Sequence, residues 1–251
     1  MPQRKRARSP LDRHWRTALA AGAGVAVVAA HMAPAALRWA DLRSRVAPRL
    51  SGLGERGHVA LTFDDGPDPE GTPAVLAALD RLGVRATFFL LGEQAARHPA
   101  TARAVADAGH EVATHGLSHR NPLCVPPWAA GRRLRAACCL VEKATGAAPR
   151  WFRPPYGVLT VGELAAAAQS NLRPVLWTAW GRDWEHRPVH SVVAHVLADL
   201  RPGGTVLLHD SDSATPVRGS WRTTAAALPD IVAAAATMGS AVGPLGEHGI
   251  T

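Results

Sequence analysis

From residue 58 onward, short apolar runs alternate with longer segments in which apolar residues recur every three to four positions. The runs predict strands at 58–63, 84–91, 111–114, 150–153, 173–179 and 204–209. The segments between them predict helices at about 72–82, 93–108, 127–145, 160–170, 189–200 and 222–238. Strands that alternate with helices imply a parallel sheet with crossover helices, and six or seven such units indicate an α/β barrel. Active residues are then expected at the carboxyl ends of the strands.

The chain before this pattern is basic and then apolar. Residues 1–16 carry six Arg or Lys against Asp12 and predict a cytoplasmic N-terminus. Residues 17–37 are free of Asp, Glu, Lys and Arg, and as a helix they are long enough to cross a membrane as a signal anchor. Counted only as 17–30, the run has the size of a cleaved signal peptide, which would give a secreted protein. A buried alanine-rich helix of a soluble protein is the third interpretation, and it leaves the flanking arginines unexplained.

The net charge of +8 is confined to the first 50 residues, which hold ten Arg or Lys and two Asp or Glu. The remainder is neutral, so we expect no nucleic-acid partner. Residues 38–56 are predicted to be a basic linker against the membrane surface, and residues 57–245 a single extracytoplasmic domain, expected to be monomeric. Three cysteines, without CxxC spacing, predict neither a disulfide scaffold nor a zinc-thiolate site.

Two adjacent carboxylates, Asp64 and Asp65, follow the first apolar run and precede the turn residues Gly66 and Pro67. Neighbours in a regular strand point to opposite faces. Both carboxylates can therefore share a pocket only if the backbone bends at the end of the strand. One could then bind a metal and the other a proton, although the same residues also suit a solvated turn.

His115 and His119 follow the third apolar run and have the i, i+4 spacing that brings two side chains together on a helical turn. With Asp65 they would give three protein ligands and leave a metal open to water. A divalent ion lowers the pKa of bound water from 15.7 toward about 7.

Polar and aromatic residues also follow the later strands. Arg153 follows the fourth apolar run and can orient a carboxylate. Trp180 and Trp184 suit the apolar faces of sugar rings, although tryptophan is more often a core residue. His209 ends the last predicted strand.

Together these segments resemble the five motifs of the polysaccharide deacetylases, the NodB-homology domain of carbohydrate esterase family 4. The motifs are Thr62-Phe63-Asp64-Asp65-Gly66, His115-Gly116-Leu117-Ser118-His119, Arg153-Pro154-Pro155-Tyr156-Gly157, Asp183-Trp184 and Leu207-Leu208-His209. The resemblance covers about residues 57–240. It implies a distorted (β/α)7 barrel and metal-dependent removal of acetyl groups from N-acetylated sugars such as peptidoglycan or chitin-like oligosaccharides.

The resemblance also implies residue roles. Asp65, His115 and His119 would bind one divalent ion, usually zinc, with cobalt, nickel or manganese as alternatives. Asp64 would be the general base, oriented by Arg153.

The leaving group and the acetyl group would be handled by further residues. His209 would be the general acid, tuned by Asp183. The backbone N–H of Tyr156 would belong to the oxyanion hole, while Trp184 and Leu207 would line the acetyl pocket.

Two positions depart from the family pattern. Gly116 stands where Ser or Thr is frequent, which would loosen the ligand loop, and Trp180 replaces a frequent Asp, which would make that part of the pocket more apolar. We therefore expect an N-deacetylase in the cell envelope. The alternatives are the same site acting on another amide or on an O-acetyl ester, and an inactive glycan-binding protein.

Overall fold

The structure, a computed structural model, describes residue 22 and residues 25–250. The predicted cytoplasmic segment 1–16 lies outside these residues, as do positions 17–21 and 23–24 of the predicted anchor. In the part of the chain that is described, no helix combines the length and the apolar character that a membrane crossing requires. Residues 25–32 are helical and lead into a short 3-10 helix, η1 (Ala33–Arg38).

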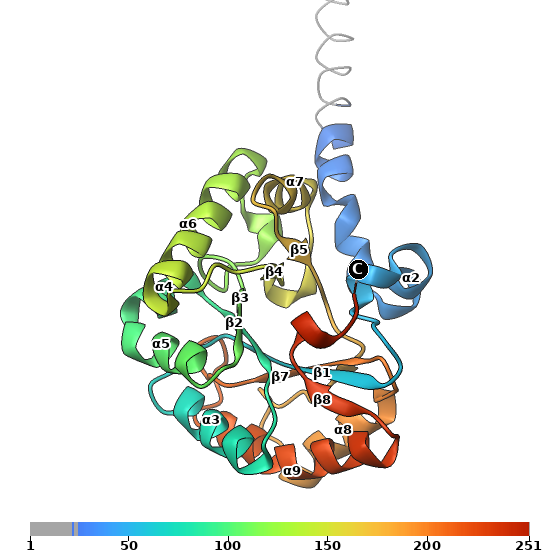
Figure 1. Ribbon diagram of the computed structural model, residues 1–251. Helices are drawn as coiled ribbons and strands as arrows, with labels where there is room; N and C mark the ends of the chain where they lie inside the picture. The colour runs from blue at the N-terminus through green and yellow to red at the C-terminus, as the bar shows by residue number, and fades with distance from the viewer. Residues whose placement is uncertain (1–21, 23–24, 251) are drawn as a thin grey trace, which may run out of the picture.

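Parallel strands form the centre of the domain, and helices surround them (Figure 1). The strands are β1 (His58–Asp64), β2 (Thr87–Leu90), β3 (Glu111–Thr114), β4 (Trp151–Phe152), β5 (Arg173–Pro174), β6 (Ala179–Trp180), β7 (Thr205–His209) and β8 (Ala241–Gly243). Their order is β5-β4-β3-β2-β1-β7-β6, and β8 pairs with the beginning of β1. The predicted α/β barrel is thus confirmed as a curled parallel sheet.

The helices follow the predicted pattern closely. They are α2 (Ala40–Val46), α3 (Gly71–Leu82), α4 (Gly92–Arg97), α5 (Pro99–Asp107), α6 (Pro127–Thr145), α7 (Val161–Gln169), α8 (Val189–Asp199) and α9 (Trp221–Thr237), with 3-10 turns η2 (Pro48–Ser51), η3 (Pro122–Cys124), η4 (Pro155–Gly157) and η5 (Leu245–Glu247). The single helix predicted at 93–108 is instead α4 and α5. Pro99 begins the second helix because it lacks the N–H that a continuous helix would use.

The main core lies between the sheet and the helices α3, α5, α8 and α9. All seven residues of β1 are buried, as expected for a strand covered on both faces. The rings of Phe63 and Phe88 stack there with centroids 4.9 Å apart. Burial of each such side chain contributes about 1.5–3 kcal/mol to the free energy of folding. The core thereby holds in place the strands whose ends carry the polar motifs.

The strand predicted at 173–179 is wrong, because this segment crosses from one edge of the sheet to the other. Its backbone N–H groups donate to three partners in turn. Val175 donates to Phe152 of β4, Leu176 to Leu50 of η2, and Thr178 to Thr205 of β7. The segment therefore supplies the short strands β5 and β6 at opposite edges, and η2 lies at the gap between them.

Residues 33–51, which comprise the end of the predicted anchor (33–37) and most of the predicted linker (38–51), fold against the domain. Arg43 of α2 is only 2% exposed. Its Nη2 donates to the carbonyl of Trp177 at 2.6 Å, and its Nη1 donates to the carbonyls of Leu37 and Arg38 at 2.9 and 3.1 Å. A buried guanidinium is costly unless it is hydrogen-bonded, and here it fastens the N-terminal segment to the crossing segment.

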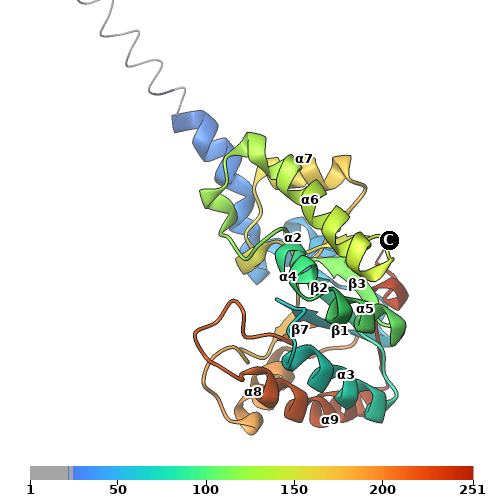
Figure 2. The ribbon, with the colours of Figure 1, turned by 90° about the vertical axis from the view of Figure 1, so that its left-hand side faces the viewer.

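Figure 2 shows that the loop into α8 and the loop after β7 project from the same side of the molecule. All three cysteines are free, and Cys124 and Cys139 are exposed.

Candidate active site

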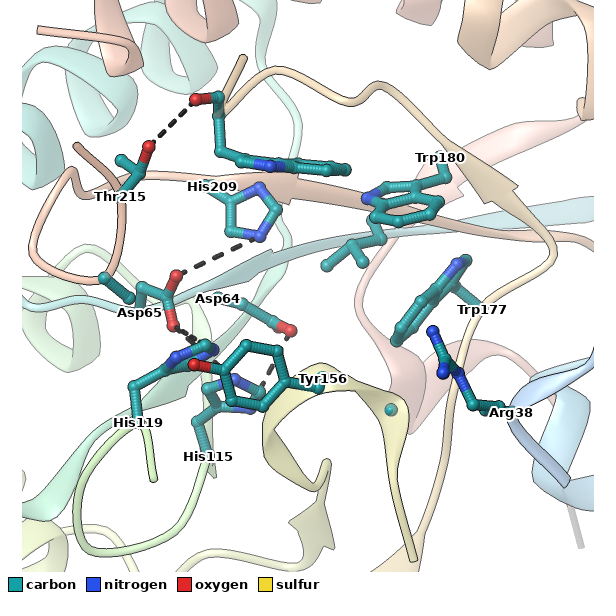
Figure 3. A pocket seen from close by; sticks show the side chains of 14 residues that line it. Arg38, Asp64, Asp65, His115, His119, Tyr156, Trp177, Trp180, His209 and Thr215 are labelled. Atoms are coloured by element: carbon teal, nitrogen blue, oxygen red, sulfur yellow. Dashed lines mark hydrogen bonds and ion pairs between the residues drawn. The ribbon is translucent and has the colours of Figure 1, made fainter. Parts of the chain in front are cut away.

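The two carboxylates at the end of β1 line the same cavity, which has a volume of about 220 Å3 (Figure 3). Asp64 is the last residue of β1, and Asp65 has a positive φ of 75°. The chain therefore bends where the sequence requires it. Gly66 must follow because a Cβ there would lie 2.4 Å from Oδ2 of Asp210.

Asp64 is held by a buried arginine. Nη1 of Arg153 donates to Oδ1 of Asp64 at 2.7 Å and to Oγ1 of Thr62 at 2.9 Å, and Nη2 donates to the carbonyl of Leu176 at 3.0 Å. The guanidinium also lies 4.0 Å from the centroid of the Phe89 ring. Burial raises the pKa of Asp64, and the positive charge of Arg153 opposes that rise. Oδ2 accepts no hydrogen bond from the described residues, so it is the oxygen available to a ligand.

Asp65, His115 and His119 form a group whose ligand atoms all lie within 4.8 Å of one another. Oδ1 of Asp65 lies 3.5 Å from Nε2 of each histidine. This oxygen is buried and has no hydrogen-bond partner among the residues that the structure describes. An orphaned carboxylate oxygen between two imidazole nitrogens fits a divalent cation, because it is the donor set of an open metal site.

The two histidines meet on a loop, and the predicted helical turn is wrong. Residues 115–119 have no helical structure, and Gly116 has a φ of +88°, which a glycine adopts without strain. The N–H of Gly116 donates to Thr114 Oγ1 at 3.2 Å, and its carbonyl accepts from the N–H of Gly92 at 2.9 Å. Glycine at this position thus permits the turn that brings the imidazoles together, and bonds on both sides hold it.

The protonation of the histidines suits a metal. Burial lowers the pKa of His115 and of His119 to about 3 in each case, so both imidazoles are neutral at pH 7. Nδ1 of His115 lies 2.8 Å from the carbonyl of Arg153, which makes Nδ1 the protonated nitrogen and leaves the Nε2 lone pair free. Burial raises the pKa of Asp65 to about 7, and a cation bound there would lower it.

His209 faces Asp65 from the end of β7. Its Nδ1 lies 2.9 Å from Oδ1 of Asp183, while its Nε2 lies 4.0 Å from Oδ2 of Asp65. The other oxygen of Asp183 accepts from the backbone N–H of His209 and from Thr224 Oγ1, both at 2.7 Å. Burial opposes a charged imidazole, but the carboxylate of Asp183 prevails and raises the pKa of His209 to about 9.

Aromatic rings line one wall of the cavity. Trp184 packs edge-on against His209 with ring centroids 5.5 Å apart, Trp180 stacks on Trp184 at 4.5 Å, and Trp177 follows Trp180 at 5.6 Å. On the opposite side, the ring of Tyr156 lies 4.4 Å from that of His119 (Figure 3). This row of indole faces can pack against the apolar face of a sugar.

The structure brings the sequence-predicted residues together. Those that line the cavity are Asp64, Asp65, His115, His119, Tyr156, Trp180, Trp184, Leu207 and His209. Arg153 and Asp183 lie behind it and contact Asp64 and His209. Sequence reasoning did not single out Arg38, Trp177 or Thr215, which also line the cavity. The basic character of residues 38–56 was the only signal for Arg38.

Comparison with known proteins agrees with this arrangement. The polysaccharide deacetylase family model matches residues 52–175. A chitooligosaccharide deacetylase from Bradyrhizobium sp. (strain ANU 289) is 42% identical over 153 residues, which are 61% of this chain and 70% of that protein.

Two solved structures add to this likeness. A peptidoglycan N-acetylglucosamine deacetylase is 32% identical with a TM-score of 0.75, and the match covers 83% of this chain and 96% of that one. A pseudoenzyme of carbohydrate esterase family 4 from Bacillus anthracis is 27% identical with a TM-score of 0.69, over 76% of this chain and 64% of that one. With the site geometry and these matches together, the chain belongs to the polysaccharide deacetylase family.

Proposed function

We propose that the protein is a zinc-dependent hydrolase that removes N-acetyl groups from an N-acetylated glycan. The observation that carries the proposal is the buried, unpartnered Oδ1 of Asp65 between the Nε2 atoms of His115 and His119. These three side chains would hold the ion. A divalent cation supplies Lewis acidity toward the acetyl carbonyl and makes water a stronger acid.

Two residues beside the metal ligands carry out the two proton transfers of the reaction. Oδ2 of Asp64 takes the proton of the attacking water, because Arg153 occupies Oδ1 and fixes the carboxylate plane. Nε2 of His209 then gives a proton to the leaving nitrogen, and Asp183 stabilises the imidazolium before that transfer. Base and acid line the same cavity as Asp65, so one amide can be reached by both.

The remaining residues bind the acetyl group. Leu207 is 2% exposed, and with Trp184 it would form an apolar wall for the methyl group. Tyr156 has a left-handed backbone, with φ 60°, which would turn its N–H toward the oxyanion. The N-acetylated glycans that the relatives act on, chitooligosaccharides and peptidoglycan, support the same substrate class.

We also propose an extracytoplasmic, membrane-tethered catalytic domain that acts as a monomer. The support is the basic N-terminus followed by residues 17–37, which hold no Asp, Glu, Lys or Arg and of which 33–37 lie against the domain. Fractionation of cells that express the full chain with a C-terminal tag tests this. Tag in the membrane fraction and open to protease from outside is the expected result, and tag in the cytosol would contradict the proposal.

The function is tested by acetate release from the purified full chain on chitooligosaccharides and peptidoglycan fragments. Activity that disappears with a chelator and returns with zinc is expected. Cobalt, nickel and manganese are added back in parallel to identify the preferred ion. Bound zinc without acetate release from any glycan would contradict the N-deacetylase assignment, and small N-acetyl amides and O-acetyl esters would then distinguish another hydrolase from an inactive glycan-binding protein.

A further inference from the structure

We infer that Arg38 binds a negatively charged group of the substrate, so that the preferred glycan is an anionic one. This inference rests on the proposed function and narrows its substrate class to N-acetylated sugars that carry a carboxylate or a phosphate. Among the described residues, Arg38 is the only arginine or lysine that lines the cavity. Figure 3 shows its guanidinium beside Trp177, at the end of the cavity away from Thr215.

The charge of Arg38 is available to a ligand. The side chain is exposed, and among the side chains that the structure describes, which do not include that of Asp41, no carboxylate forms an ion pair with it. Arg153, the buried arginine behind the cavity, is used by Asp64 and by backbone carbonyls. A guanidinium that is open to solvent at a cavity mouth can bind a carboxylate or a phosphate through two parallel hydrogen bonds.

The position of Arg38 is built into the fold. The buried Arg43 donates to the carbonyls of Leu37, Arg38 and Trp177 and so ties the backbone of residues 37–38 to the crossing segment. Leu50 adds a further bond, because its carbonyl accepts from the N–H of Leu176 at 2.8 Å. Burial lowers the pKa of Arg43 to about 10, which still leaves it charged at pH 7. The N-terminal segment is thus docked so that Arg38 lines the cavity beside Trp177 (Figure 3). Arg182, whose guanidinium lies 5.5 Å from the centroid of the Trp180 ring, does not line the cavity.

A row of three tryptophans extends from the proposed acid His209 to Arg38. Trp184, Trp180 and Trp177 follow one another from His209 toward Arg38. A sugar whose acetamide lies between Asp64 and His209 can therefore extend along the indole faces, and a charged substituent on it or on its neighbour reaches the guanidinium. Neutral oligosaccharides fit the same wall but leave Arg38 without a partner.

The test compares substrates that differ only in charge. The zinc-loaded full chain, in detergent, is given N-acetylglucosamine 1-phosphate and its uncharged methyl glycoside, and in a second arm a disaccharide-peptide fragment of peptidoglycan and its methyl esters. We expect the wild type to prefer the charged member of at least one pair. Arg38→Gln should lower kcat/KM for that member by about tenfold, the effect of losing one charge-assisted hydrogen bond, chiefly through KM.

Three controls separate recognition from structure. Arg38→Lys should keep part of the preference, because the charge remains while the two parallel hydrogen bonds of the guanidinium are lost. Arg45→Gln, which removes an exposed arginine of α2 that does not line the cavity, should leave both substrates unaffected. High salt should reduce the preference of the wild type and not that of Arg38→Gln. A loss confined to the phosphate arm or to the carboxylate arm identifies which anion is bound.

Binding is also measured without turnover, from the change in tryptophan fluorescence when the metal-free protein is titrated with each substrate. Equal effects of Arg38→Gln on charged and uncharged members, in rate or in binding, overturn the inference. If no substrate releases acetate but charged ligands still bind in an Arg38-dependent way, the deacetylase proposal fails and the anion site stands. Arg43→Met should reduce the charge preference as well, since it releases the backbone that places Arg38.

Discussion

A half-buried carboxylate at the amino end of the sheet, Glu111, and a buried one at the carboxyl end, Asp65, differ in how their oxygens are used. At the amino end, Glu111 begins β3, and both of its oxygens are used. Oε1 accepts from Nε1 of Trp151 at 2.9 Å, and Oε2 accepts from Thr87 Oγ1 at 2.7 Å and from the N–H of Gly246 at 2.9 Å. At the carboxyl end, Asp65 follows β1 with Oδ1 buried and unpartnered.

The carboxylate of Glu111 serves the stability of the fold, whereas that of Asp65 serves metal binding. The bonds of Glu111 tie the C-terminal segment to the sheet, so they contribute to the free energy of folding. A buried carboxylate oxygen without a donor costs about 1–3 kcal/mol instead, and this cost is recovered only when a cation binds. Glu111 thus has both oxygens hydrogen-bonded where β3 begins, whereas Asp65 keeps one oxygen free where the metal ligands meet.

The largest expected effect comes from removing one of the three metal ligands at the carboxyl end of the sheet. His119→Ala leaves only Asp65 and His115, so zinc content should fall well below one per chain and acetate release should fall to background. Metal analysis after gel filtration and the acetate assay measure both quantities. A variant that retained stoichiometric zinc would show that the ligand set is wrong.

A smaller loss is expected when the metal stays and the base is removed. Asp64→Asn keeps the shape of the side chain and its contact with Arg153 but cannot accept a proton. Turnover should fall by about 1,000-fold, within the range for general-base catalysis, while zinc content stays near that of the wild type. Wild-type turnover in this variant would remove the base assignment.

Most strands and helices, and the residues of the metal group, could be predicted from the sequence because they depend on local sequence patterns. The apolar runs located the strands, and Gly146, with its positive φ, ends α6 at the residue where the predicted helix ends. Parallel strands place their carboxyl ends on one edge, so motifs at strand ends were expected to meet. The metal group Asp65, His115 and His119 follows from that rule together with the family resemblance.

What could not be predicted depends on contacts between distant segments. The run 173–179 has the composition of one strand, yet its backbone bonds divide it between two edges of the sheet. The roles of Trp177 and Arg38 follow from that crossing and from the burial of Arg43. A charged residue in a basic segment gives no sign that it will be buried in a neighbouring domain. The strand β8 was missed because it is only three residues long.

A matched pair of amide substitutions tests the comparison itself. Glu111→Gln places an NH2 group among three donors, so we expect the free energy of unfolding to fall by about 2 kcal/mol, with zinc content and turnover per folded molecule unchanged. Asp65→Asn at the other end should abolish zinc binding and leave the stability of the metal-free protein unchanged or higher, because it removes a buried charge. Chemical denaturation of the metal-free proteins measures both. Equal losses of stability would refute the contrast between the two ends.

The smallest effect concerns the pH dependence of the free energy of unfolding, as set by two histidines at the amino end of the sheet. Nδ1 of His58, at the start of β1, lies 2.8 Å from Nδ1 of His248, whose Nε2 lies 3.1 Å from the carbonyl of Gly52. Burial lowers the pKa of His58, and it lowers the pKa of His248 from 6.5 to about 4. Between these values the unfolded chain binds a proton that the native protein does not, so stability is lost as the pH falls from 6.5 toward 4.

Replacing His248 should reduce this loss. For zinc-loaded protein, in which His115 and His119 are held by the metal, we expect the drop in unfolding free energy between pH 7 and pH 5 to be about 1–2 kcal/mol smaller in His248→Gln than in the wild type. The carboxylates of Glu247 and Glu55 favour the protonated form of His58. The pH dependence of stability that remains in His248→Gln therefore includes the contribution of His58. Denaturation curves at the two pH values give the difference. An identical slope in both proteins would show that His248 does not contribute to the acid sensitivity and would assign it to other buried groups, such as His110, whose pKa burial lowers to about 4.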